Sequence, residues 1–96
     1  MSLRWRSEIE REAAAAYRAL THLLRELSMI EESAIPAAEQ NLALSERLLA
    51  SGASDVFRVL LARNDLYTQR EHRIDLMRRA WRAYAELDHA VGGLNQ

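Results

Sequence analysis

The sequence predicts an all-α fold, a long antiparallel helical hairpin with coiled-coil-like packing. Ala (16), Leu (15), Arg (13) and Glu (10) fill 54 of the 96 positions, a bias typical of long helices. Strand-forming residues are scarce, with four Ile, three Val and two Thr. The helix-breaking residues are Pro36, Gly52 and the pair Gly92-Gly93, and they divide the chain into two long arms joined by one turn.

The first arm, predicted over residues 4–50, has apolar residues at alternating spacings of four and three. This heptad pattern predicts a helix that packs against one neighbour, with Leu20 and Leu27 among the packing residues. Pro36 lies inside the pattern and removes one backbone donor, so we expect a kink or a fresh helix start there. The heptad positions are Ile9, Ala13, Ala16, Leu20, Leu23, Leu27, Ile30, Ala34, Ala37, Asn41, Leu44 and Leu48.

The turn between the arms, residues 51–55, combines a helix stop with a helix start. Gly52 can adopt the left-handed conformation that ends a helix. Ser54 is a good N-terminal cap, and Asp55 in the next turn is favoured by the helix dipole. Because the connection is only a few residues long, the second arm must return antiparallel to the first.

The second arm, predicted over residues 55–91, has two adjacent apolar stripes, which is wider than one neighbour requires. We therefore expect Leu60, Leu66, Tyr67, Ile74, Met77, Trp81 and Tyr84 to pack against other helices. One stripe contains Val56, Leu60, Tyr67, Ile74, Met77, Trp81, Tyr84 and Val91, and is interrupted by Arg63, Arg70 and Asp88. The other contains Val59, Ala62, Leu66, Leu76, Ala80, Ala83, Leu87 and Ala90, and is interrupted by Gln69 and Arg73.

A single hairpin domain is expected over residues 4–93. Gly92-Gly93 would close the second helix, residues 94–96 would form a tail, and residues 1–3 would be a cloning remnant. Arms of roughly 40 residues would each extend about 60 Å at the helical rise of 1.5 Å per residue. The apolar surface left over predicts self-association of the isolated hairpin into a bundle.

Composition excludes several classes of function. The net charge is −1 and acids alternate with the thirteen arginines, so the chain has no general attraction for nucleic acid or anionic lipid. Without cysteine there is no disulfide, thiolate metal site or cysteine nucleophile. No apolar run approaches the roughly 18 residues that span a bilayer, so we expect a soluble chain.

We expect no enzymatic activity, and no metal or cofactor. The hairpin register separates His22, His72 and His89 by tens of ångströms, so they cannot share an ion. Glu86 and His89 match the Glu-x-x-His pattern of di-iron bundles, but such a site needs a second copy and further inward Glu residues. A small helical metalloenzyme therefore ranks far behind other interpretations.

Specific sequence around the turn and the second arm resembles the periplasmic hairpin of TolC-like outer-membrane efflux proteins, in their second repeat. The resemblance covers about residues 8–93. It rests on Ala38-Glu39-Gln40-Asn41-Leu42-Ala43-Leu44 after Pro36, on the Gly-containing turn followed by Val56-Phe57-Arg58-Val59-Leu60-Leu61-Ala62-Arg63, and on Leu87-Asp88-His89-Ala90-Val91-Gly92-Gly93 near the end.

The resemblance implies a conduit component without catalysis, located in the periplasm of a Gram-negative cell. Hairpins of a homotrimer form the tunnel, and their tips dock on a periplasmic adaptor protein that connects the tunnel to an inner-membrane pump. Small tip residues would permit close approach by the adaptor. The implied adaptor-docking tip comprises Leu49, Ser51, Gly52, Ala53, Ser54, Asp55 and Val56. An alternative is a self-contained helical interaction or scaffold module that dimerises into a four-helix bundle.

Overall fold

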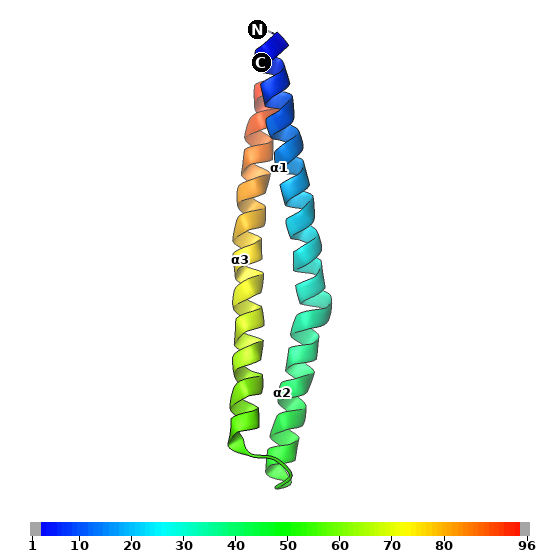
Figure 1. Ribbon diagram of the computed structural model, residues 1–96, viewed down its shortest axis with the longest axis vertical. Helices are drawn as coiled ribbons and strands as arrows, with labels where there is room; N and C mark the ends of the chain where they lie inside the picture. Colours follow the sequence, from blue (N-terminus) through cyan, green and yellow to red (C-terminus); the bar gives the residue numbers. More distant parts are fainter. Residues whose placement is uncertain (1–2, 95–96) are drawn as a thin grey trace. The chain divides into compact units, whose positions relative to one another are not determined.

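The computed structural model describes residues 3–94 and is all-α in this range (Figure 1). Its elements are α1 (Leu3–Met29), the π-helix η1 (Ile30–Ala34), α2 (Ile35–Ala50) and α3 (Val56–Leu94). Residues 1, 2, 95 and 96, at the ends of the predicted remnant and tail, lie outside the described residues.

Packing divides the chain into two compact units, each built from one segment of either arm. Among the described residues, the first combines residues 3–26 with residues 76–94, and the second is Leu27–Asp75. Within each unit the two segments lie side by side and run antiparallel (Figure 1). The predicted fold class, an all-α antiparallel hairpin, is confirmed.

In the second unit, α2 ends in a Schellman motif at Gly52. The φ angle of Gly52 is +78°, the left-handed conformation predicted for it. The N–H of Gly52 donates to the carbonyl of Leu49 (3.0 Å), and the N–H of Ala53 donates to that of Leu48 (2.9 Å). The hydroxyl of Ser51 also donates to the Leu48 carbonyl (3.0 Å), so the turn satisfies the carbonyls that the helix end leaves free.

The cap of α3 is Asp55 and not Ser54. Oδ1 of Asp55 accepts a hydrogen bond from the backbone N–H of Arg58 at 3.1 Å, the usual geometry of a side-chain cap three residues before its donor. The prediction placed the cap one residue too early because both residues are good caps. The Schellman turn extends through Ala53, so α3 begins only at Val56.

In the first unit, α3 continues through Gly92 and Gly93 to Leu94, past the stop predicted for it. Glycine disfavours a helix interior by only about 1 kcal/mol relative to alanine, which flanking helical residues can offset. At Gly93 an added Cβ would lie 3.6 Å from Cδ1 of Ile9, so this glycine faces the α1 segment.

The buried residues of each arm follow heptad spacing, as predicted for the first arm up to Ile30. In α1 and η1 these are Ile9, Ala16, Leu23 and Ile30. In α3 the second of the two predicted stripes is the buried one, and Leu76 is fully enclosed with 0% of its surface exposed. The buried residues of α3 are Val59, Ala62, Leu66, Leu76, Ala80, Ala83 and Ala90.

Pro36 is accommodated by the π-helix that precedes it. The N–H of Ile35 donates to the carbonyl of Ile30, five residues back. Each such hydrogen bond in η1 therefore spans one more residue than in an α-helix. Pro36 then lies in the first turn of α2, where its missing donor costs least. The chain stays helical from Leu3 to Ala50, so Pro36 marks a local rewinding and not a break.

The extra residue shifts the buried stripe of α2 by one position. Beyond Ile30 the next buried residue is Ile35, five positions on where the unshifted pattern expects four, followed by Ala38 and Ser45. Leu44, which the unshifted pattern placed in the interface, is 46% exposed, whereas Ser45 is only 2% exposed. The hydroxyl of Ser45 donates to the carbonyl of Asn41 at 2.8 Å, so the buried polar atom is satisfied within its own helix.

The phase shift predicts opposite responses at two neighbouring positions. Ser45→Glu should destabilise the hairpin by about 2 kcal/mol or more, because it buries an unpaired carboxylate. Leu44→Glu should change the unfolding free energy by only about 0.5 kcal/mol, because the side chain already faces solvent. Urea denaturation followed by circular dichroism measures both. A larger loss for Leu44→Glu would restore the unshifted heptad.

Arg73 is a polar interruption of the buried stripe of α3. Its Nε atom is buried and has no hydrogen-bond partner. Arg73→Leu should therefore stabilise the chain by about 1 kcal/mol, because it removes an unsatisfied buried donor and extends the apolar stripe. The matched control is Arg82→Leu at an exposed position, which should have little effect on the denaturation midpoint. Equal effects of the two substitutions would contradict the assignment.

Candidate partner-binding surfaces

Two exposed surfaces of residues 3–94 are candidates for binding a partner: the tip between α2 and α3, and one face of α3. Of the tip residues named from the sequence, Ser51 to Asp55 form the connection, while Leu49 lies in the last turn of α2 and Val56 begins α3. Gly52, Ala53 and Asp55 are exposed, and Leu49 and Ser54 are half-buried beneath them. An added Cβ at Gly52 would meet no atom within 4 Å, so the surface above this residue is open.

Sequence reasoning missed two exposed apolar residues beside the tip. Phe57 and Leu61 lie one helical turn apart at the start of α3, and 75% and 69% of their surfaces are exposed. Neither belongs to a heptad stripe, and that mismatch was the available signal. An aromatic and an aliphatic side chain next to the turn enlarge the apolar surface that a docking partner could cover.

We refer to the exposed apolar stripe of α3 as the outer face. Its apolar members are between 42% and 69% exposed. Six predicted packing residues, namely Leu60, Tyr67, Ile74, Met77, Trp81 and Tyr84, lie on the outer face, while Leu66 is buried and Leu20 and Leu27 are half-buried in the hairpin. The outer face comprises Val56, Leu60, Arg63, Tyr67, Arg70, Ile74, Met77, Trp81, Tyr84, Asp88 and Val91.

Two aromatic rings stand together on the outer face. The rings of Trp81 and Tyr84 pack edge to face, with centroids 5.9 Å apart and planes at 85°. This geometry holds two large side chains in one arrangement on an exposed surface. Trp and Tyr are the residues that most often dominate binding energy at protein interfaces, so this pair is the best anchor that the described residues offer.

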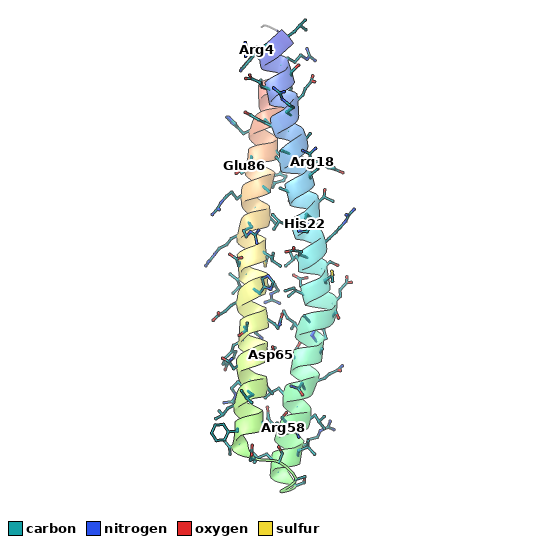
Figure 2. The ribbon with its side chains drawn as sticks, viewed as in Figure 1. Arg4, Arg18, His22, Arg58, Asp65 and Glu86 are labelled. Atoms are coloured by element: carbon teal, nitrogen blue, oxygen red, sulfur yellow. The ribbon has the colours of Figure 1, made fainter. Side chains whose placement is uncertain are left out.

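The charged residues do not gather into a site. Figure 2 labels six charged or polar side chains distributed along the arms, all of them exposed. Arg6 and Glu10 form an ion pair at 3.3 Å, and Nε2 of His22 lies 2.8 Å from Oε1 of Glu26, each pair within α1. Exposed pairs one helical turn apart contribute only a few tenths of a kcal/mol.

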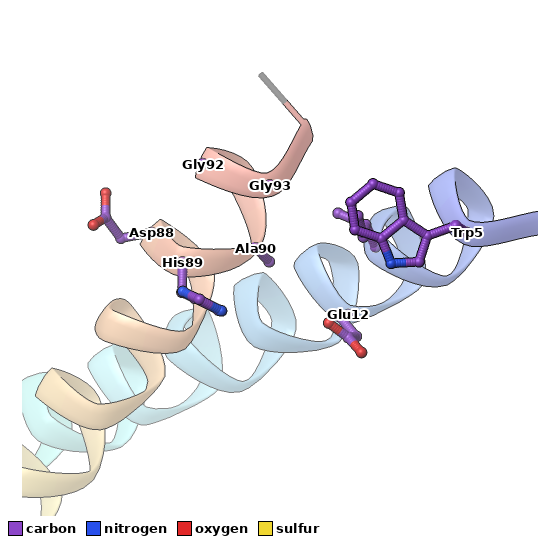
Figure 3. A pocket seen from close by; sticks show the side chains of 8 residues that line it. Trp5, Glu12, Asp88, His89, Ala90, Gly92 and Gly93 are labelled. Atoms are coloured by element: carbon purple, nitrogen blue, oxygen red, sulfur yellow. The ribbon is translucent and has the colours of Figure 1, made fainter. Parts of the chain in front are cut away.

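A pocket of about 530 Å³ lies in the first unit. Trp5 and Glu12 line it from α1, and Asp88, His89 and Gly93 are among the α3 residues that line it (Figure 3). Between residues 3 and 94, no three or more His, Asp and Glu side chains are placed to hold a metal ion. The Glu86 and His89 pattern therefore gains no further ligands.

Within the same described range, no helix has both the length and the apolar composition needed to cross a bilayer.

The backbone conformations of Gly52 and Gly92 predict opposite effects on stability when each is replaced by alanine. Gly52→Ala should destabilise the hairpin by about 1 kcal/mol, because an L-residue at positive φ is strained even where space is free. Gly92→Ala should stabilise by about 0.5–1 kcal/mol, because this glycine is helical and an added Cβ meets nothing within 4 Å. Thermal denaturation of the pair compares them directly. Stabilisation by Gly52→Ala would exclude the left-handed turn.

Comparison with known proteins provides no further assignment: no family model, curated protein or solved structure matches the chain.

Proposed function

We propose that this chain is a periplasmic tunnel-forming hairpin of a TolC-like outer-membrane efflux channel, and that its tip docks on a periplasmic adaptor protein. The observation that supports the proposal best is the tip itself. Gly52 turns the chain at positive φ, open space lies above it, and small exposed residues flank it. A partner backbone can approach such a surface closely.

The outer face supports the same proposal from a second direction. In a wall made of hairpins, the second arm of each hairpin contacts the first arm of the same hairpin and also a neighbouring hairpin. The buried stripe of α3 serves the first contact, and the outer face is available for the second. In this proposal the channel is a homotrimer, the inner-membrane pump is reached through the adaptor, and the hairpin performs no catalysis.

A test of the tip needs a substitution that leaves the fold intact. Ala53→Trp places a bulky ring on an exposed tip residue. The backbone N–H of this residue can still donate to the Leu48 carbonyl and so keep the Schellman motif. Introduced into a full-length channel protein that contains this hairpin, it should weaken adaptor binding by about tenfold or more and reduce efflux, because close approach is blocked. Pull-down of the adaptor and export of a fluorescent substrate measure the two effects.

The matched control is Ala14→Trp, an equally small residue exposed on α1 and far along the chain from the tip. It should leave adaptor binding and efflux unchanged. Gly52→Pro should act like Ala53→Trp while most helicity remains. Normal efflux with both tip variants would rule out adaptor docking at the tip.

A second candidate function is a helical interaction module that dimerises into a four-helix bundle. It is favoured by the heptad spacing of the outer face, which continues from Val56 to Val91 with alternating steps of four and three. In this alternative the outer face binds a second hairpin directly, without an adaptor. Ala53→Trp would then leave the assembly of the chain unchanged.

A further inference from the structure

α3 contains two complete heptad stripes, of which the hairpin buries one. α3 is a single helix from Val56 to Leu94, so residues at alternating steps of four and three lie along one side of it. The outer face follows this spacing at every position, including its three charged residues. A second helix can therefore pack along it by inserting its side chains between those of the outer face.

We propose that the outer face binds the outer face of a second copy of this chain, with the two α3 helices antiparallel. A two-fold axis midway between residues 75 and 76 would relate the copies. Residues at the first core heptad position of one helix then face residues at the second core position of the other helix, as antiparallel packing requires. Such an interface is isologous, so each contact occurs twice.

The charges of the outer face select this orientation. In the antiparallel register Arg63 of one copy faces Asp88 of the second copy, and the reciprocal pair forms at the other end. A parallel arrangement in register would instead place Arg63, Arg70 and Asp88 each opposite its own counterpart. Like charges facing each other across an interface oppose association, so the parallel arrangement is disfavoured.

The remaining charged residue also has a suitable partner. In the same register Arg70 faces Trp81 of the second copy, the most exposed apolar member of the outer face at 69%. A guanidinium over an indole ring is a favourable cation–π arrangement. Tyr84 lies nearly perpendicular to Trp81, with the ring centroids 5.9 Å apart, and Trp81 remains largely exposed beside it.

The layers between and beyond the charged ones are apolar. Near the axis Ile74 faces Met77 of the second copy, and Tyr67 faces Tyr84 one layer further out. The outermost described layer pairs Leu60 with Val91. All five kinds of pair arise from one register, and the only charge that it places against an uncharged side chain is that of Arg70, which faces the indole of Trp81.

A register displaced by one heptad fits less well. It would pair Arg70 with Asp88 of the second copy, but it would leave Arg63 and Leu60 without facing residues in the described part of α3. The opposite displacement would place Asp88 against Val56. Of the three registers, the proposed one is therefore the one that places Arg63 opposite Asp88 while giving a facing residue to every outer-face position from Leu60 to Val91.

The experiment is sedimentation equilibrium on the 96-residue chain and its variants. The unmodified chain should form a concentration-dependent dimer of twice 11.0 kDa. Arg63→Glu and Asp88→Arg should each raise the dissociation constant about tenfold or more, because each creates two like-charge contacts. The double variant Arg63→Glu/Asp88→Arg should return the constant close to that of the unmodified chain.

Ile74→Glu should also disrupt the dimer, since it places a carboxylate beside the axis. Leu61→Glu is the control, because Leu61 is also an exposed aliphatic residue of α3 but lies outside both stripes, and it should leave the dissociation constant unchanged. Circular dichroism on every variant verifies that helicity is retained.

A chain that stays monomeric up to about 100 μM would overturn the proposal, as would a different stoichiometry. Rescue of Asp88→Arg by Arg70→Glu in place of Arg63→Glu would establish the displaced register instead. The inference does not depend on the efflux proposal. Tip variants test adaptor docking without touching α3 contacts, and outer-face variants test dimerisation without touching the tip, so the two failures are distinguishable.

Discussion

The structure depends on keeping the buried stripes of the two arms facing each other within each unit. In α3 the buried positions keep the heptad spacing without a phase shift. The first arm must therefore present its own buried positions in the same phase over its whole length. Pro36 prevents an undisturbed α-helix there, because its ring would collide with the carbonyl four residues earlier. The π-helix resolves this conflict by changing the winding of one turn, and the buried stripe resumes one position later, at Ile35 in place of Ala34.

The composition and the breaker residues were enough to predict the fold class and the left-handed Gly52. The phase of α2 was not predicted, because Ala34, Ala37, Leu44 and Leu48 continue the heptad spacing of the first arm without a shift, whereas the stripe that is buried contains Ile35, Ala38 and Ser45. Only the geometry of η1 decides between them, and it leaves Leu44 exposed while burying Ser45. The helix also outlasted Gly92 and Gly93, because two glycines weaken a long helix without ending it.

The candidate surfaces could also be predicted from the sequence only in part. Two apolar stripes on α3 predicted that one would be left for a partner, and the burial pattern identifies which one. The choice could not be made from hydrophobicity, since the exposed stripe contains the larger side chains, including Trp81. The buried stripe is rich in alanine, which allows the two arms to approach closely, so residue size and not apolar character separates the internal contact from the external one.

The π-helix also makes the two arms unequal in their tolerance of length changes. A helix that already contains one extra residue in a turn can lose a residue there, or redistribute one, while the segments on both sides keep their faces. α3 has no such place, and a single insertion or deletion would rotate every following side chain by about 100°. Over evolutionary time, indels should therefore accumulate near residues 30–36 and be absent from the middle of α3.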